Sequence, residues 1–387
     1  MGVQWTREVI SMKKLNVALV GLGFGGAFAP IYKAHPDVGE IILCDSNPQR
    51  LKATAEFAKI EKTTTSFDEI LSDPAIDAVH LVTPIPLHGR QAVQVLKSGK
   101  HCACTVPMAT SLEDIRAIFK AKRESGKNYM MMETTLYTYQ FLYVQQMKKE
   151  GKLGRIQFLR GCHYQDMANW PPYWTGLPPM WYGTHAIAPM TVLSDSRICR
   201  VNCFGSGTMD PALTTQYGNP FPVECAIFEF ENGLKAEATR SLFETARTYQ
   251  EGMFVYGSER SFEWGHADWD NPVITTLINA KPGEVGGRTE QETITLPNPY
   301  ETLPESLWPF TVGGNFDPLH PQDSLKIGAG GGHHGSHPHL VHEFVRSCIE
   351  ERKPAIDEVL GANISAAGIC AHESALRNGE PVIVPKF

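Results

Sequence analysis

The chain has 387 residues, which is too long for one ordinary hydrophobic core, so two domains are expected. Hydrophobic residues make up 42% and charged residues 20%, as in a globular protein, and a formal net charge of −7 gives no electrostatic case for binding nucleic acid. No apolar stretch approaches the roughly 20 residues that cross a bilayer, and the first residues lack a secretory apolar core, so we expect a cytoplasmic protein without membrane contact.

The first informative feature is a strand-like run followed by glycines. Val17–Val20 is apolar, and Gly21, Gly23 and Gly26 then follow in G-x-G-x-x-G spacing before a helix-like stretch. This order is typical of a dinucleotide site, in which the glycines permit a tight turn, close approach of a pyrophosphate and close packing of the helix. We therefore predict that the whole turn contacts the cofactor: Gly21, Leu22, Gly23, Phe24, Gly25 and Gly26.

A second apolar run, Ile41–Cys44, ends at Asp45, about 20 residues after the glycines, where an acid that binds ribose is expected. A carboxylate accepts hydrogen bonds from ribose hydroxyls and repels a 2′-phosphate, which favours NAD over NADP. Arg50 lies near enough in the sequence to contact the cofactor and keeps NADP open. The alternative is an ordinary strand–helix turn in which Asp45 caps a loop.

Strand-like and helix-like segments alternate from about residue 15 to residue 130, which predicts an α/β domain with a doubly wound parallel sheet. One strand, 78–82, ends in Thr83 and Pro84, and His88 opens the next helix. Ligands of such sheets bind at the carboxyl ends of the strands, so we expect these three residues to contact the cofactor.

After residue 153 strand-like segments follow one another, which predicts an α+β domain with a large, mainly antiparallel open sheet. We place the NAD-binding domain at 1–135 and a domain for substrate and oligomerisation at 136–387. Residues 280–335 are rich in Gly and Pro and are predicted to be surface loop. Two helices are predicted beyond them, at 338–350 and 361–377, and the last helix can pack back on the first domain.

These motifs resemble the Gfo/Idh/MocA family of nicotinamide-dependent sugar oxidoreductases. The resemblance rests on the glycine turn, on Thr83-Pro84 with His88, and on the segment 99–109, which follows the family's G-K-H-V-x-x-E-K-P pattern. Thr105 and Val106 replace the family's Glu and Lys, the latter commonly the proton-transfer residue, and Val106 is expected to contact the cofactor instead. In the family's Asp-x-x-x-His motif, His185 remains and the Asp is lost.

The departures resemble a subgroup that includes glycoside hydrolase family 109, a set of NAD-dependent glycosidases. The shared motifs are E-V-P, M-M-x-E followed by Tyr, Y-x-T-H and a late H-G-G, which match Val106, Glu133, Tyr137, Tyr182 with His185, and His334 in order. The resemblance implies oxidation of a pyranoside ring hydroxyl, expected at C3, within a redox-neutral cycle of oxidation, elimination, hydration and reduction. A net sugar or glycoside dehydrogenase is the alternative, and a non-catalytic NAD-binding sensor is the second alternative.

Three side chains are candidates for the chemistry. A neutral imidazole accepts a proton near pH 7, so His185 is predicted to take the proton of the sugar hydroxyl, and Tyr182 to assist it. Tyr137 is the candidate for the second base. A packing role remains the alternative for Tyr137 and His185.

The substrate is expected to be a sugar or glycoside held by aromatic and polar residues of the second domain and its loops. The stretch 169–182 is rich in Trp, Tyr and Pro, as a sugar-stacking wall or a stiff packed loop would be, and five histidines lie within 331–342. We predict no metal, and a homo-oligomer (dimer or tetramer) from the resemblance alone. The predicted substrate-binding residues are Glu133, His163, Trp170, Trp174, Trp181, His334 and His337.

Overall fold

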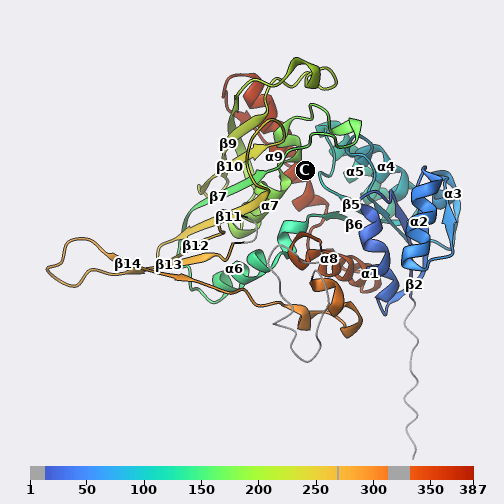
Figure 1. The fold of residues 1–387 in the computed structure, drawn as a ribbon, viewed down its shortest axis with the longest axis horizontal. Coiled ribbons are helices and arrows are strands. Elements are labelled where there is room, and N and C mark those ends of the chain that lie inside the picture. The colour runs from blue at the N-terminus through green and yellow to red at the C-terminus, as the bar shows by residue number, and fades with distance from the viewer. Residues whose placement is uncertain (1–13, 268–269, 313–331) are drawn as a thin grey trace, which may run out of the picture.

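The computed structural model describes residues 14–267, 270–312 and 332–387 (Figure 1). Its first sheet has six parallel strands in the order β3-β2-β1-β4-β5-β6, which confirms the predicted doubly wound domain. The order reverses between β1 and β4, and a ligand crevice is expected at such a point. The strands are β1 (Leu15–Val20), β2 (Val38–Cys44), β3 (Thr63–Thr64), β4 (Ala78–Leu81), β5 (His101–Thr105) and β6 (Tyr129–Met132).

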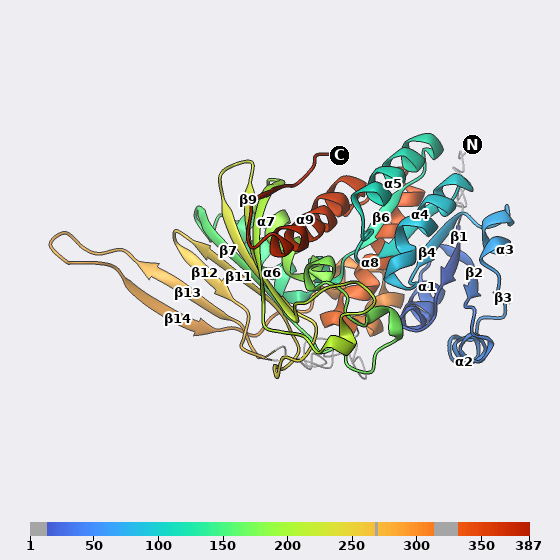
Figure 2. The same cartoon turned by 90° about the horizontal axis from the view of Figure 1, so that it is seen from above.

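Helices cover both faces of this sheet, with α4 and α5 on one face and α1 on the other (Figure 2). Side-chain caps fix where several of them begin. Ser111 Oγ accepts a hydrogen bond from the Asp114 amide at 3.1 Å, and Asn47 caps α2 in the same way. The helices are α1 (Ala29–Ala34), α2 (Pro48–Ala58), α3 (Phe67–Ser72), α4 (His88–Lys97) and α5 (Leu112–Ser125).

The second sheet has nine strands in the order β14-β13-β12-β11-β7-β10-β9-β8-β15, and only the pair β7 and β10 is parallel among the pairs that the structure describes. The mainly antiparallel sheet that the sequence predicts is therefore confirmed. Its strands are β7 (Ile156–Tyr164), β8 (Ile198–Ser206), β9 (Val223–Phe230), β10 (Lys235–Ser241), β11 (Gln250–Gly257), β12 (Arg260–Glu263), β13 (Val273–Ile278), β14 (Arg288–Thr293) and β15 (Val382–Ile383).

Four helices lie between the two sheets (Figure 2): α6 (Tyr139–Lys149), α7 (Thr184–Leu193), α8 (Gly332–Ile349) and α9 (Glu358–Leu376). Helix α9 contacts β8 on one side and β6 on the other, and Ser365 Oγ accepts a hydrogen bond from the Met108 amide at 3.0 Å. Helix α7 packs tightly on β7, because a side chain at Gly161 would stand 2.1 Å from the Ala186 carbonyl oxygen. This close packing brings residues at the start of α7 to the end of β7.

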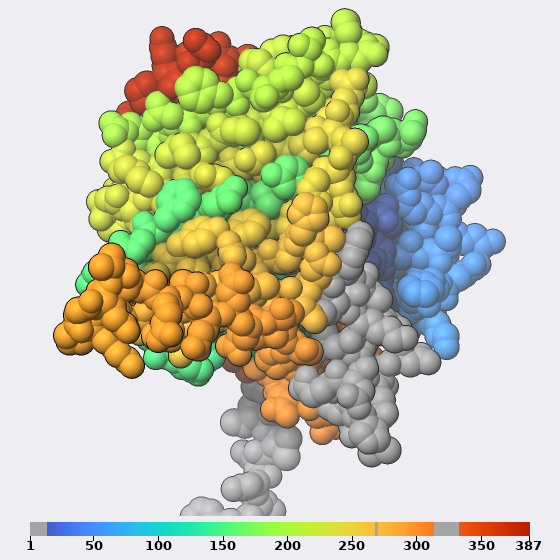
Figure 3. All heavy atoms as spheres, turned by 60° about the vertical axis from the view of Figure 1, so that its left-hand side comes forward, coloured from blue at the N-terminus to red at the C-terminus, as the bar shows by residue number. Residues whose placement is uncertain are grey.

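One part of the second domain differs from the prediction. Residues 280–335 were expected to form surface loop, but β14 lies within them and pairs with β13 in a hairpin that projects from the body (Figures 1 and 2). Every residue of β14 is exposed, so the strand lacks the alternation of apolar and polar residues by which strands are recognised. Two 3-10 helices, Tyr300–Thr302 and Glu305–Thr311, also lie within the predicted loop, and residues 313–331 of it lie outside the described residues. The outer face of the sheet forms a broad open surface (Figure 3).

Candidate active site

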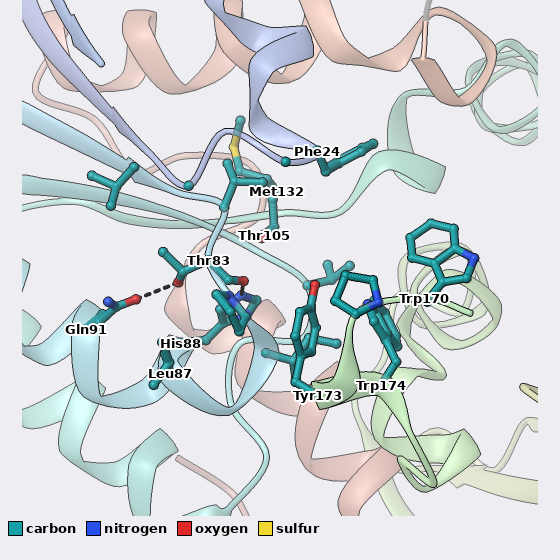
Figure 4. Close-up of a pocket in the computed structure, with 18 of the residues that line it drawn as sticks. Phe24, Thr83, Leu87, His88, Gln91, Thr105, Met132, Trp170, Tyr173 and Trp174 are labelled. Atoms are coloured by element: carbon teal, nitrogen blue, oxygen red, sulfur yellow. Dashed lines mark hydrogen bonds between the residues drawn. The ribbon is translucent and has the colours of Figure 1, made fainter. Parts of the chain in front are cut away.

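A cavity of about 790 Å³ lies where the carboxyl ends of β1, β2, β4 and β5 face the second domain. Residues of both domains line it, so that the glycine turn and the histidines of the second domain face one continuous space. Figure 4 shows Tyr173, Trp174 and Trp170 on one side of the pocket, Thr83 and His88 on another, and Phe24 and Met132 on a third. The predicted residues that line it are Gly21, Gly23, Phe24, Asp45, Arg50, Thr83, Pro84, His88, Val106, His163, Trp170, Trp174, Tyr182 and His185.

The glycine turn has the backbone that a dinucleotide site needs. Gly21 has a φ of 88°, in the left-handed region, and a Cβ there would stand 2.4 Å from the Val82 carbonyl oxygen. At Gly23 an added Cβ would meet nothing closer than the Arg50 side chain at 3.9 Å, so the space above its backbone is open to a ligand. Leu22, Gly25 and Gly26 shape the turn but do not line the cavity.

Asp45 lies at the end of β2 and is only 5% exposed. Its carboxylate accepts hydrogen bonds from the backbone amides of Leu22 at 2.7 Å and Asn47 at 2.8 Å, which tie it to the glycine turn. Nη1 of the half-exposed Arg50 side chain lies 3.3 Å from this carboxylate. The carboxylate is therefore held where β2 ends, beside the turn that the pyrophosphate of a dinucleotide would approach.

His88 links the turn after β4 to the turn after β5, and residues of both turns line the cavity. Its ring nitrogens each lie 2.8 Å from a carbonyl oxygen, those of Thr83 and Pro107. Burial lowers the pKa of His88, although these two contacts act in the opposite direction. Thr83 in turn donates a hydrogen bond to Gln91 at 2.5 Å (Figure 4). The contact of His88 with the Pro107 carbonyl holds the backbone next to Val106, which lines the cavity.

His185 lies on the opposite wall, in the first turn of α7, and is 3% exposed. Its Nδ1 lies 2.6 Å from Glu133 Oε1, and its Nε2 lies 3.3 Å from the Tyr182 hydroxyl. Burial by itself would raise the pKa of Glu133, but His185 and the surrounding hydrogen bonds together hold it below its usual value. Burial raises the pKa of Tyr182, so its hydroxyl stays protonated. The Glu133 carboxylate thus fixes which imidazole nitrogen faces the cavity.

Besides Leu22, Gly25 and Gly26, five predicted residues lie outside the cavity lining, for reasons of packing. Glu133 is fully buried behind His185 and contacts that ring. Tyr137 stacks on His339 at 6.1 Å between ring centroids, and Trp181 packs edge-on against Tyr217 and His372. His334 lies against Gln140 and Trp264, and His337 stacks on Phe28 at 4.3 Å.

The structure also brings into the site residues that were not individually predicted. His333, rather than its two predicted neighbours, lines the cavity, and its Nδ1 lies 2.8 Å from the buried Glu251. The backbone turns His333 in this way because residues 333–335 all have positive φ at the start of α8. Tyr249, Gln165 and Tyr173 line the cavity as well. Gln165 directly follows β7 and Tyr249 directly precedes β11, so their meeting depends on the pairing of these two strands.

Residues 15–133 match the family model described as oxidoreductase family, NAD-binding Rossmann fold, under the name GFO_IDH_MocA. These residues are therefore similar to the NAD-binding domain of the Gfo/Idh/MocA oxidoreductase family. The glycine turn, the open backbone at Gly23 and the carboxylate of Asp45 fit NAD(H), the cofactor of this domain. No helix among the described residues combines the length and the apolar character required to cross a membrane.

Curated relatives match about half of the chain. A levoglucosan dehydrogenase of Pseudarthrobacter phenanthrenivorans is 29% identical over 194 residues, which cover 48% of each protein. A glycosyl hydrolase family 109 protein of Porphyromonas gingivalis is 25% identical over 203 residues, which cover 48% of this chain and 43% of the relative. The match thus spans about half the length of these relatives.

Solved structures resemble the whole fold. Levoglucosan dehydrogenase in complex with NADH has a TM-score of 0.78 at 21% identity, covering 97% of this chain and 100% of that one. Apo scyllo-inositol dehydrogenase from Lactobacillus casei has a TM-score of 0.70 at 17% identity, covering 96% of this chain and 99% of that one. At these identities the likeness concerns the fold.

Proposed function

We propose that this chain is an NAD-dependent dehydrogenase that oxidises a ring hydroxyl of a pyranose sugar or glycoside. The observation that carries the proposal is one cavity lined both by the glycine turn with Asp45 and by His185 with Tyr182. Bound NAD⁺ supplies the acceptor for the hydride that leaves the sugar carbon. The chain must then position the sugar and accept the proton of the hydroxyl.

His185 is positioned to accept the proton of the sugar hydroxyl, and Tyr182 is positioned to assist it. Because Glu133 holds Nδ1 at 2.6 Å, Nε2 faces the Tyr182 hydroxyl and the cavity. We propose that the sugar hydroxyl binds between Nε2 and the tyrosine, which stays protonated and donates a hydrogen bond. The imidazole then accepts the hydroxyl proton directly.

An aromatic wall supports the assignment of a sugar. Trp170 and Trp174 meet edge to face at 5.9 Å between ring centroids, and Trp174 meets Tyr182 in the same way at 4.8 Å. Trp170 is 48% exposed, so part of its ring remains open to a ligand. Aromatic faces pack against the C–H faces of pyranose rings, while His163 and Gln165 offer polar atoms to the hydroxyls.

A redox-neutral glycosidase is the second candidate, and the relatives of glycosyl hydrolase family 109 favour it. Its elimination step needs a second base beside the sugar. Tyr137, the candidate from the sequence, lies outside the cavity, and burial raises its pKa, so it stays protonated there. The position of Tyr137 supports the dehydrogenase as the first choice.

A single assay distinguishes the dehydrogenase, the glycosidase and a non-catalytic sensor. The full chain is incubated with NAD⁺ and a panel of aryl pyranosides, and NADH and released aglycone are measured together. Accumulating NADH without aglycone supports the dehydrogenase. Aglycone without accumulating NADH supports the glycosidase, and tight NAD⁺ binding without either product contradicts both enzymes.

We also propose that the chain forms a homo-oligomer through the open face of the second sheet. Phe204, Ile227 and Ile383, which lie on three neighbouring strands of this sheet, are each 46% exposed or more. Such a surface suits burial against a second copy. Light scattering in solution measures the oligomeric state, and a monomer at all concentrations would contradict this proposal.

A further inference from the structure

Three buried side chains from three different elements converge on one point at the wall of the cavity. His163 comes from β7, His185 from α7 and Glu251 from β11, and one possible ligand atom of each lies within 4.8 Å of the other two. His185 Nε2 is 4.0 Å from Glu251 Oε1, and the two imidazole rings are 4.9 Å apart. Each of the three residues is at most 3% exposed.

His163 is the member of this cluster whose ring nitrogens point most clearly to a ligand. Neither of its ring nitrogens has a hydrogen-bond partner in the described part of the chain, although the residue is only 1% exposed. Burial, reinforced by the positive charge of Arg240, lowers the pKa of His163 well below its usual value, so the ring is neutral and carries a lone pair. A buried polar atom without a partner is destabilising, and a ligand bound at this lone pair would offset that cost.

His185 and Glu251 are oriented and charged in ways that suit the same ligand. Glu133 holds Nδ1 of His185 and thereby aims Nε2 at the cluster, as carboxylates do behind histidines that bind metals. Glu251 is fully buried; burial by itself would raise the pKa of its carboxyl, but His333 and His185 hold it well below the usual value. His185 and Glu251 therefore each place a possible ligand atom within 4.8 Å of one on His163.

We propose that His163, His185 and Glu251 bind one divalent transition-metal ion, such as Zn²⁺, with a fourth position open to the cavity. Two imidazoles and one carboxylate are a common ligand set for zinc in catalytic sites. Ligand atoms around tetrahedral zinc are about 3.3 Å apart for bonds of about 2.0 Å, so the three side chains would close by about 1 Å.

The inference shares its site with the proposed function and would change one of its steps. With the ion bound, Nε2 of His185 is a ligand, and the sugar hydroxyl takes the open position. The ion would then lower the pKa of that hydroxyl, whose proton would pass to solvent water in the cavity, while the hydride of the same carbon would pass to NAD⁺.

Metal binding is measured on the full chain without an affinity tag. The protein is stripped with a chelator, dialysed and titrated with ZnCl₂ by calorimetry, and CoCl₂ is added to a second sample for its visible spectrum. We expect one ion per chain, a rise in the unfolding temperature with Zn²⁺, and a cobalt spectrum typical of nitrogen and oxygen ligands. No binding at one ion per chain would overturn the inference.

Variants place the ion. His163→Gln and Glu251→Gln are each expected to weaken Zn²⁺ binding at least tenfold. His372→Gln is the matched control, because His372 is also buried and lies 2.6 Å from a buried glutamate, Glu224, but does not line the cavity. Circular dichroism checks that each variant folds. If a variant does not fold, the cobalt spectrum of the unaltered chain still tests the site. Unchanged affinity in both cluster variants would overturn the inference.

The two proposals fail in different ways. NADH formation from a sugar by protein that binds no metal would overturn the metal site and leave the dehydrogenase. A bound ion at His163 and Glu251 in a protein that oxidises no sugar would overturn the dehydrogenase and leave the metal site.

Discussion

Substituting Gly23 by alanine is expected to weaken cofactor binding without lowering the stability of the fold. An added methyl group would meet only the Arg50 side chain, at 3.9 Å, which is ordinary van der Waals contact, and Gly23 lies outside the left-handed region. Gly23→Ala is therefore expected to leave the free energy of unfolding unchanged or raise it by about 0.4–1 kcal/mol. The methyl group would instead occupy space that the pyrophosphate approaches, so the Kd for NADH should rise at least about tenfold, or about 1.4 kcal/mol.

Gly21→Ala is the matched control, two residues away in the same turn. Its Cβ would stand 2.4 Å from the Val82 carbonyl oxygen, and its φ of 88° costs an alanine about 1–2 kcal/mol before that clash. This variant should lose both stability and NADH binding. NADH fluorescence titration and thermal unfolding measure the two quantities. Wild-type NADH affinity in Gly23→Ala would refute the placement of the dinucleotide, and a lowered unfolding temperature would refute the claim that the space is empty of protein.

Three further predictions follow from buried groups. Glu133→Gln replaces a charge-assisted contact with His185, worth about 1.5–3 kcal/mol, so turnover should fall about 10–100-fold with NADH affinity unchanged; an equal loss of NADH affinity would contradict a positioning role. Asp45→Ala should raise the Kd for NADH about tenfold and lower stability, because the Leu22 amide loses its acceptor; calorimetry measures the first effect and thermal unfolding the second. Burial lowers the pKa of His80 to about 3 and that of His339 to about 4, so the unfolded chain binds more protons below the ordinary value of about 6.5. Stability should therefore fall as the pH drops from about 6.5 towards 4, by about 2 kcal/mol for each histidine at pH 5, and urea unfolding that shows no such loss would contradict their burial as neutral rings.

The parts of the site that lie within one strand and the turn that follows it could be predicted from the sequence. The glycine turn, Asp45 and Thr83 are each defined by a local pattern, and a parallel sheet places its carboxyl ends along one edge. His185 could be selected because its motif resembles that of a family. Its partner Glu133 also appeared in a motif, but the sequence could not tell that its carboxylate points at His185 rather than at a sugar.

The rest depends on tertiary packing. Glu251 lies on β11 and His163 on β7, and only the pairing of these strands brings them together. The histidine-rich segment offered several candidates, and the left-handed backbone at His333 and His334 decides which of them faces the cavity. Tyr137 follows β6 in a short 3-10 turn, whose geometry aims its ring at His339 instead of the cavity.

Transfer of deuterium tests the central claim most directly. The chain is incubated with NAD⁺ and glucose, galactose, mannose or their methyl glycosides, each deuterated at the ring carbons, and the cofactor is examined by mass spectrometry. Our account predicts deuterium on the nicotinamide ring of NADH with at least one sugar, and none when His185 is replaced by alanine. Bound NAD⁺ that acquires deuterium from no sugar would contradict it.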